Sequence, residues 1–112
     1  MFRPLAAMRI ACSLGLILPT LATGEQPLWG YGVRSCPDYL EAATGDAAEL
    51  QRYEDWLTGF VSGLNLATGD DVLRGSGIES AMRRTRKYCE GHPDDDFFNA
   101  TMEFVRMLSS LR

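Results

Sequence analysis

The chain has 112 residues, of which 46% are hydrophobic and 23% charged, so it suits one globular domain and is too apolar for a disordered protein. Glycine and proline number 11 and 5, which excludes collagen and low-complexity linkers. Eleven Lys and Arg residues against fifteen Asp and Glu residues give a net charge of −4. This acidic balance argues against nucleic acid as the main partner, because proteins that bind nucleic acids present basic surfaces.

Residues 1–24 are predicted to be a secretory signal peptide that is cleaved from the mature protein. Arg3 and Arg9 precede an uncharged apolar run, residues 10–18, that is too short to span a bilayer. The small residues 22–24 then form a fair cleavage site. A lipid anchor at Cys12 is disfavoured, since this cysteine precedes most of the apolar run. We therefore expect a periplasmic protein with no membrane anchor after cleavage.

The mature chain, residues 25–112, is expected to contain one disulfide bond. The leader carries two basic residues and no acids, so nine basic residues remain against fifteen acidic ones, a balance of −6. Cys36 and Cys89 allow only one pairing, and the compartment is oxidising. Closing so long a loop contributes roughly 4 kcal/mol in the chain-entropy model, out of a total stability on the order of 5–10 kcal/mol. A redox role is disfavoured because the spacing is not that of a CxxC motif.

An N-terminal arm and a first helix open the mature chain. Residues 25–34 show no periodicity and contain two glycines and a proline, which predicts an extended arm. Ser35, followed three residues later by Asp38, is a capping-box pattern, and Pro37 suits a first helical turn. We expect the helical domain to span residues 35–112 and its first helix to end near Gly45.

The second and longest helix is predicted from Asp46 or Ala47 to Ala67. Gly59 and Gly63 lie beside its apolar stripe in a G-x-x-x-G spacing, for which close approach of another helix in the same fold is the favoured explanation. Self-association or a groove for a client protein is the alternative. The apolar stripe recurs at helical spacing and consists of Leu50, Tyr53, Leu57, Phe60, Val61 and Leu64.

A third helix is predicted to begin at a second capping box, Ser76 with Glu79, and to end at Cys89 with Gly91 as its cap. One face is apolar: Ile78, Ala81, Met82, Thr85, Tyr88 and Cys89. The other is basic: Arg83, Arg84, Arg86 and Lys87. A solvated helix face is the favoured interpretation of these charges, and a site for an acidic partner or a phosphate is the alternative.

The fourth helix is predicted to have Pro93 at its first position and the acidic residues 94–96 in its first turn, where the helix dipole favours acids. Successive helical positions point about 100° apart, so these three carboxylates are not expected to bind one metal ion. The buried stripe consists of Phe97, Phe98, Thr101, Met102, Val105 and Leu108. The fold class is therefore all-α, a small bundle of about four helices stapled by the Cys36–Cys89 disulfide.

The sequence contains little catalytic chemistry. Its one histidine, His92, stands beside Pro93 at a helix junction, where capping is its expected role. We find no nucleophile with a base and an orienting group, and no metal-ligand cluster, phosphate loop or dinucleotide fingerprint. The chain is therefore predicted not to be an enzyme and to need no cofactor or metal.

Three segments carry a family resemblance: Cys36-Pro37-Asp38-Tyr39-Leu40, then Gly59-Phe60-Val61-Ser62-Gly63-Leu64-Asn65, then Cys89. They resemble the C-x-D-[FY]-L opening, the G-[FY]-x-x-[AG]-x-N helix and the late cysteine of the HdeA/HdeB family of periplasmic acid-stress chaperones. The resemblance covers most of the mature chain. It implies a helical, disulfide-stapled protein that is dimeric at neutral pH and that loosens in acid to hold unfolding periplasmic proteins.

A client or dimer surface is expected on the second helix if this resemblance holds. Protonation of the acidic residues would remove the net negative charge and leave the chain positive, while the disulfide would limit unfolding. The residues expected to form this surface are Trp56, Leu57, Gly59, Phe60, Gly63 and Leu64.

A second, fainter resemblance supports a different function. The segment Tyr88-Cys89-Glu90-Gly91-His92-Pro93 resembles the Rap/Tai type of immunity protein, whose members are small, exported and helical and neutralise a toxin in the periplasm. Their usual cysteine placement differs from the one here. The alternative function is therefore a specific binding protein that acts at neutral pH, with the basic residues 83–87 as its candidate surface.

Overall fold

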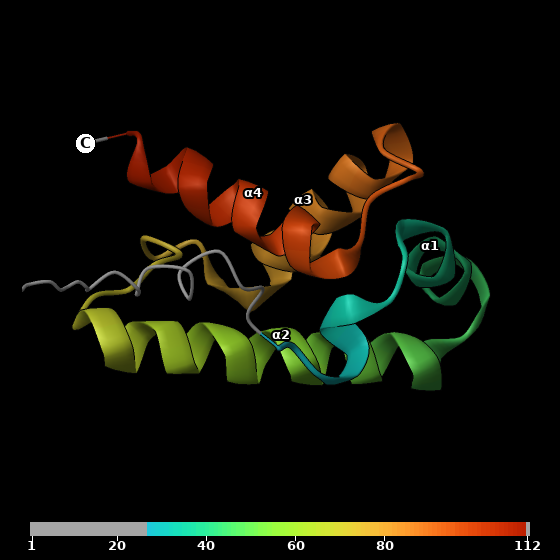
Figure 1. Ribbon diagram of the computed structural model, residues 1–112, viewed down its shortest axis with the longest axis horizontal. Helices are drawn as coiled ribbons and strands as arrows, with labels where there is room; N and C mark the ends of the chain where they lie inside the picture. Colours follow the sequence, from blue (N-terminus) through green and yellow to red (C-terminus); the bar gives the residue numbers. More distant parts are fainter. Residues whose placement is uncertain (1–26, 112) are drawn as a thin grey trace, which may run out of the picture.

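The computed structural model describes residues 27–111, which form four α-helices and one short 3-10 helix (Figure 1). The all-α fold class is confirmed, whereas the predicted signal peptide, residues 1–24, lies outside the described residues. Helix α2 runs along one side of the molecule, with α3 and α4 above it and α1 at one end (Figure 1). The elements are η4 (Gly30–Val33), α1 (Cys36–Gly45), α2 (Ala47–Thr68), α3 (Gly77–Gly91) and α4 (Phe97–Ser109).

The predicted disulfide between Cys36 and Cys89 is confirmed. It joins the first turn of α1 to the end of α3 across a Cα–Cα distance of 5.0 Å, and both cysteines are buried. Beside it, the Cys36 N–H donates to the Asp95 carbonyl oxygen at 2.8 Å, and the Phe97 N–H donates to the Arg34 carbonyl oxygen at 3.0 Å. The start of α1 is thus tied covalently to α3 and by two hydrogen bonds to the connection between α3 and α4.

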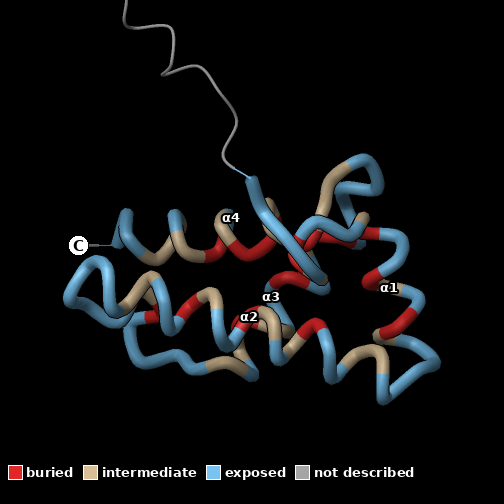
Figure 2. The backbone as a smooth tube through the Cα atoms, turned by 60° about the horizontal axis from the view of Figure 1, so that its bottom comes forward, coloured by how far each residue is buried: buried red, intermediate tan, exposed pale blue. Residues whose placement is uncertain are grey.

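Three aromatic rings from three helices form the centre of the core. Tyr39 of α1, Tyr53 of α2 and Phe97 of α4 are each no more than 1% exposed, and their ring centroids lie 4.6–5.1 Å apart. The Tyr39 hydroxyl lies 3.0 Å from the Met82 carbonyl oxygen and 3.2 Å from Thr85 Oγ1, so the cluster also reaches α3. Each such aromatic pair adds about 0.5–1.5 kcal/mol beyond its buried area. The buried segments of all four helices face this centre (Figure 2).

The apolar stripe predicted for α2 is confirmed. Tyr53, Leu57 and Val61 are buried, and the remaining three members are half-buried. The core also includes Leu73, which lies in the loop between α2 and α3. The Asp71 carboxylate accepts hydrogen bonds from the Leu73 N–H at 3.0 Å and the Gly75 N–H at 2.7 Å, and the loop closed by these bonds buries the Leu73 side chain.

The predicted helix contact at Gly59 and Gly63 is wrong. Both glycines are exposed, and a Cβ atom built on either one would meet nothing within 4 Å. The neighbouring elements pack instead on the opposite side of α2, around Tyr53, Leu57 and Val61. The small residues therefore face solvent.

The predicted start of the fourth helix is also wrong. Helix α4 begins at Phe97, not at Pro93, with Asp96 as its N-cap. Asp96 has extended backbone angles, φ −132° and ψ 172°, because it pairs with Ser35 in an isolated antiparallel bridge. Residues 94–96 therefore precede the helix rather than form its first turn.

Two predicted caps of α3 differ from the structure. Ser76 makes no side-chain cap, because its hydroxyl donates to the Leu73 carbonyl oxygen at 2.6 Å. Gly91 is the last residue of α3, and the C-cap is His92. By contrast, the first predicted cap is confirmed, since Ser35 Oγ accepts the Asp38 N–H at 3.2 Å.

The open space at Gly63 leads to a stability prediction. Gly63→Ala is expected to raise the free energy of unfolding by about 0.5–1 kcal/mol, because alanine stiffens a helix interior relative to glycine and its methyl group meets no neighbour. Urea denaturation of the oxidised protein measures this change. A loss of stability would show that another helix does pack against this face.

Candidate functional site

The segment of residues 27–34, here called the strap, crosses the surface of α2. The sequence predicts an extended arm, and this is wrong for residues 30–33, which form the 3-10 helix η4. The backbone of Gly30 has φ +83°, a conformation that glycine adopts without steric cost. The strap is thereby folded onto the bundle, in contact with both α2 and α4.

The Trp56 indole packs directly against the two glycines of the strap. A Cβ atom at Gly32 would lie 2.0 Å from Trp56 Cζ2, and one at Gly30 would lie 3.2 Å from Trp56 Cδ1. The indole N–H donates to the Trp29 carbonyl oxygen at 2.9 Å. The two glycines, which in the sequence indicate only a lack of regular structure, are therefore the residues that let the strap approach α2 closely.

An acidic side chain of α2 holds the other end of the strap. The Tyr31 hydroxyl donates to Glu49 Oε2 at 3.1 Å, and Arg34 Nη1 lies 3.2 Å from the same oxygen. The Arg34 guanidinium also stacks over the Tyr31 ring, 4.1 Å from its centroid, while the Tyr31 ring packs edge-on against the Tyr53 ring with a centroid distance of 4.9 Å. Glu49 is therefore the ionic attachment of the strap.

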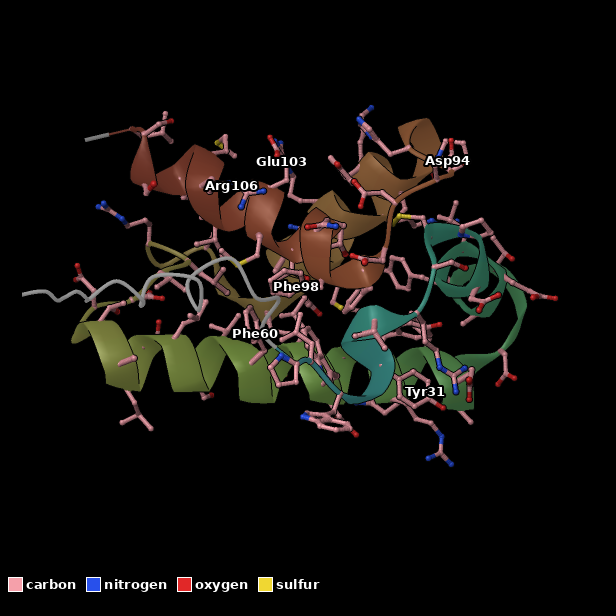
Figure 3. All side chains as sticks on the ribbon, in the orientation of Figure 1. Tyr31, Phe60, Asp94, Phe98, Glu103 and Arg106 are labelled. Atoms are coloured by element: carbon pink, nitrogen blue, oxygen red, sulfur yellow. A yellow bond between two sulfur atoms is a disulfide. The ribbon has the colours of Figure 1, made fainter. Side chains whose placement is uncertain are left out.

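An open apolar pocket of about 410 Å³ lies between the strap and α2, here called the strap pocket. Leu28 is 37% exposed and Trp29 is 78% exposed at its edge. Phe60 stacks on Trp56 with a centroid distance of 5.0 Å. Phe60 and Phe98 of α4 point toward each other across the space between their helices, with a ring-centroid distance of 5.5 Å (Figure 3). The lining residues are Pro27, Leu28, Trp29, Asp55, Trp56, Gly59 and Phe60.

The structure brings together only part of the surface that the sequence predicts. Trp56, Gly59 and Phe60 line the strap pocket, whereas Gly63 and Leu64 lie farther along α2 and do not line it. Leu57 is fully buried in the core.

The strap residues Leu28 and Trp29 were missed as part of the pocket. Their signal in the sequence is a pair of bulky apolar residues directly before the Gly30-Tyr31-Gly32 segment. The basic residues 83–87 lie, as predicted, on a face of α3 away from the core, with the four charged side chains exposed.

A second polar centre joins α3 to the start of α4. The Asp95 carboxylate accepts hydrogen bonds from the Tyr88 hydroxyl at 2.5 Å and from Asn99 Nδ2 at 2.8 Å. The Tyr88 hydrogen bond lowers the pKa of Asp95 below its ordinary value, and the same bond raises the pKa of Tyr88 to about 12. His92 Nδ1 lies 2.7 Å from the Tyr88 carbonyl oxygen, which agrees with its predicted capping role.

The described residues show no metal-binding arrangement and no membrane span. Within residues 27–111, no group of three or more His, Cys, Asp or Glu side chains is placed to hold a metal ion. None of the described helices is both long and apolar enough to cross a bilayer.

Comparisons with known proteins give no match. The chain matches no family model, no curated protein and no solved structure at a significant level.

The close contact at Gly32 predicts that Gly32→Ala displaces the strap. The added methyl group would overlap the Trp56 ring, and such overpacking costs typically about 1–3 kcal/mol. We expect a lower free energy of unfolding and an altered tryptophan emission spectrum, measured by urea denaturation and fluorescence. Gly63→Ala is the matched control, and identical emission and stability in the Gly32→Ala protein would contradict the strap contact.

The Asp95–Tyr88 hydrogen bond predicts a specific pH dependence. A carboxyl with a lowered pKa in the folded state adds stability above its unfolded pKa and loses it as pH falls through the folded value. Tyr88→Phe removes this hydrogen bond, so the variant should have a lower unfolding free energy than the wild type at neutral pH. The two unfolding free energies should converge in strong acid. Urea denaturation across pH, with NMR titration of the Asp95 carboxyl, measures both effects. A difference that does not change with pH would contradict the assignment.

Proposed function

We propose that this chain is an exported, acid-activated holdase chaperone. In this proposal the chain is folded and closed at neutral pH, and in acid it opens an apolar surface that binds unfolded proteins. The observation that carries the proposal is that carboxylate side chains accept hydrogen bonds in each connection between the helices and at the strap.

The first two junctions each depend on one aspartate. Between α1 and α2, Asp46 Oδ1 accepts the Glu49 N–H at 3.1 Å and caps α2. Between α2 and α3, the Asp71 carboxylate accepts the N–H groups of Leu73 and Gly75. These bonds are strongest when the carboxylate is ionised, because a charged acceptor roughly doubles the strength of a hydrogen bond.

Carboxylates also accept hydrogen bonds in the connection between α3 and α4 and at the strap. Between α3 and α4, Asp95 accepts the Tyr88 hydroxyl, and Asp96 Oδ1 accepts the Asn99 N–H at 2.8 Å. The strap is held by the ion pair between Arg34 and Glu49 and by the hydrogen bond from Tyr31 to the same carboxylate. The lowered pKa of Asp95, caused mainly by the Tyr88 hydrogen bond, means that acid would weaken the contact between α3 and the start of α4.

The change in net charge on acidification also destabilises the closed state. Protonation of fifteen acidic residues leaves nine basic residues and His92 in the mature chain, and self-repulsion of a strongly positive chain destabilises its compact state. The Cys36–Cys89 disulfide does not titrate over this range, so it keeps α1 attached to α3. We therefore expect partial opening rather than complete unfolding.

Release of the strap would uncover apolar side chains of α2. Trp56 and Phe60 are half-buried, and the strap covers the indole through Gly30 and Gly32. Their exposure would leave an apolar surface on α2 in place of the strap pocket, and unfolded proteins bind such surfaces because their own apolar side chains are exposed. The resemblance of the cysteine and Gly59–Asn65 segments to the HdeA/HdeB chaperones supports the same function.

Light scattering of an aggregating periplasmic extract tests the proposal. The oxidised mature protein is expected to suppress aggregation at pH about 2–3, where carboxylates are protonated, and not at pH 7. A dye that reports apolar surface should bind over the same range. No suppression in acid, together with a helical circular dichroism spectrum unchanged by acid, would reject the holdase function in favour of a specific binding protein.

Two variants test whether this activity resides on the α2 surface beneath the strap. Phe60→Ser should weaken the suppression in acid, because Phe60 lines the pocket on the α2 side and would be uncovered when the strap is released. Leu66→Ser is the matched control, since Leu66 is an apolar residue of α2 that is 87% exposed and does not line the pocket. Equal loss in both proteins would assign the binding to general hydrophobicity.

A further inference from the structure

The basic face of α3 is divided into two pairs of residues. Arg83 donates to Ser80 Oγ at 3.0 Å, and Arg86 lies 3.6 Å from a carboxylate oxygen of Glu90. Arg84 and Lys87 instead line an open groove between α3 and α4. Among the described residues, neither Arg84 nor Lys87 forms a salt bridge, although the chain as a whole is acidic.

This groove, here called the α3–α4 groove, has an apolar floor and a cationic edge. Its volume is about 220 Å³, and Phe104, which is 7% exposed, forms part of the floor. The Arg84 guanidinium lies 5.5 Å from the centroid of the Phe104 ring. The lining residues are Arg84, Lys87, Tyr88, Ala100, Glu103, Phe104 and Met107.

The single acid at the edge of the groove already has a partner. Glu103 Oε1 lies 3.7 Å from Arg106 Nη2, and both side chains lie on the outer side of α4, away from α2 (Figure 3). Arg84 and Lys87 are therefore the charges available to a ligand. Their side chains are three residues apart on one helix, so they lie on the same face.

We propose that the α3–α4 groove binds an acidic amphipathic segment of a partner protein. An apolar side chain of that segment would occupy the apolar part of the groove beside Ala100 and Met107, while flanking carboxylates would pair with Arg84 and Lys87. A phosphate ion alone would leave the apolar floor unused. The volume is also below the range of about 300–1,000 Å³ that is usual for small-molecule sites.

This binding requires ionised carboxylates on the partner, and it therefore belongs to neutral pH. The α3–α4 groove lies on the side of α4 that faces α3, whereas the strap pocket lies on α2. Because one activity needs acid and the other needs neutral pH, each can fail without the other.

Fluorescence anisotropy with a defined probe tests the proposal. The probe is a labelled peptide with the core Glu-Glu-Leu-Phe-Glu-Glu, measured at pH 7 against the oxidised mature protein. Reversal of both groove charges in the double variant R84E/K87E should weaken binding by about tenfold or more, since loss of complementary charge and introduction of like charge both act against the acidic peptide. No binding of the peptide to the wild-type protein would overturn the proposal.

The matched control is the double variant R83E/R86E. It changes the net charge by the same amount on the same helix but leaves the groove intact, so it should retain most of the binding. Equal loss in the two double variants would show diffuse attraction to a basic helix and would overturn the proposal. Far-ultraviolet circular dichroism verifies that both proteins are folded.

Two further arms test the chemistry of the occupant. A peptide with serine in place of Leu and Phe should bind the wild-type protein more weakly than the original peptide does. The original peptide should also bind the Met107→Ser protein more weakly, because both changes remove apolar contact in the groove. Equal affinity of the two peptides would overturn the role of the apolar floor. Tighter binding to phosphatidylglycerol vesicles than to the peptide, abolished by R84E/K87E, would assign the groove to a membrane surface and overturn a protein partner.

Discussion

The disulfide between Cys36 and Cys89 is the constraint on which the arrangement of the helices depends. It fixes the first turn of α1 against the end of α3, and the hydrogen bond from the Cys36 N–H to the Asp95 carbonyl oxygen fixes the same turn against the following connection. Tyr39 follows one helical turn later and reaches both α3 and Phe97 of α4. The aromatic core is therefore assembled around a covalent bond.

The interactions at the centre of the fold and those at its periphery differ in their response to pH. At the centre are the disulfide and the stacked rings of Tyr39, Tyr53 and Phe97, none of which gains or loses a proton in acid. At the junctions and the strap are carboxylates, including Asp71 and Glu49. In the proposed mechanism, opening in acid would begin at this periphery, and the Cys36–Cys89 disulfide would keep α1 attached to α3.

The sequence predicts the local features of this fold well because they depend on near neighbours along the chain. Helical periodicity indicates the buried stripe of α2, and the two cysteines that remain after the predicted leader is removed, in an exported chain, indicate the disulfide. The errors concern contacts between distant segments. Nothing near Gly59 shows that its side of α2 faces solvent, and nothing near Pro93 shows that residues 94–96 must pair with Ser35 before α4 begins. The site follows the same pattern, since Trp56 and Phe60 were predicted but the glycine contact that covers Trp56 was not.

Helix α4 contacts both of the helices that carry the proposed surfaces, α2 through one side and α3 through another. Phe98 faces Phe60 of α2, while Phe104 lies beneath Arg84 of α3. Phe97 anchors the start of the same helix in the core. If acid loosens the connection that precedes α4, the helix moves relative to both neighbours, so opening toward α2 and disruption of the α3–α4 groove occur together. The protonation that is proposed to favour capture of unfolded proteins would thus disfavour the proposed acidic partner, both through the groove geometry and through the charge of the partner itself.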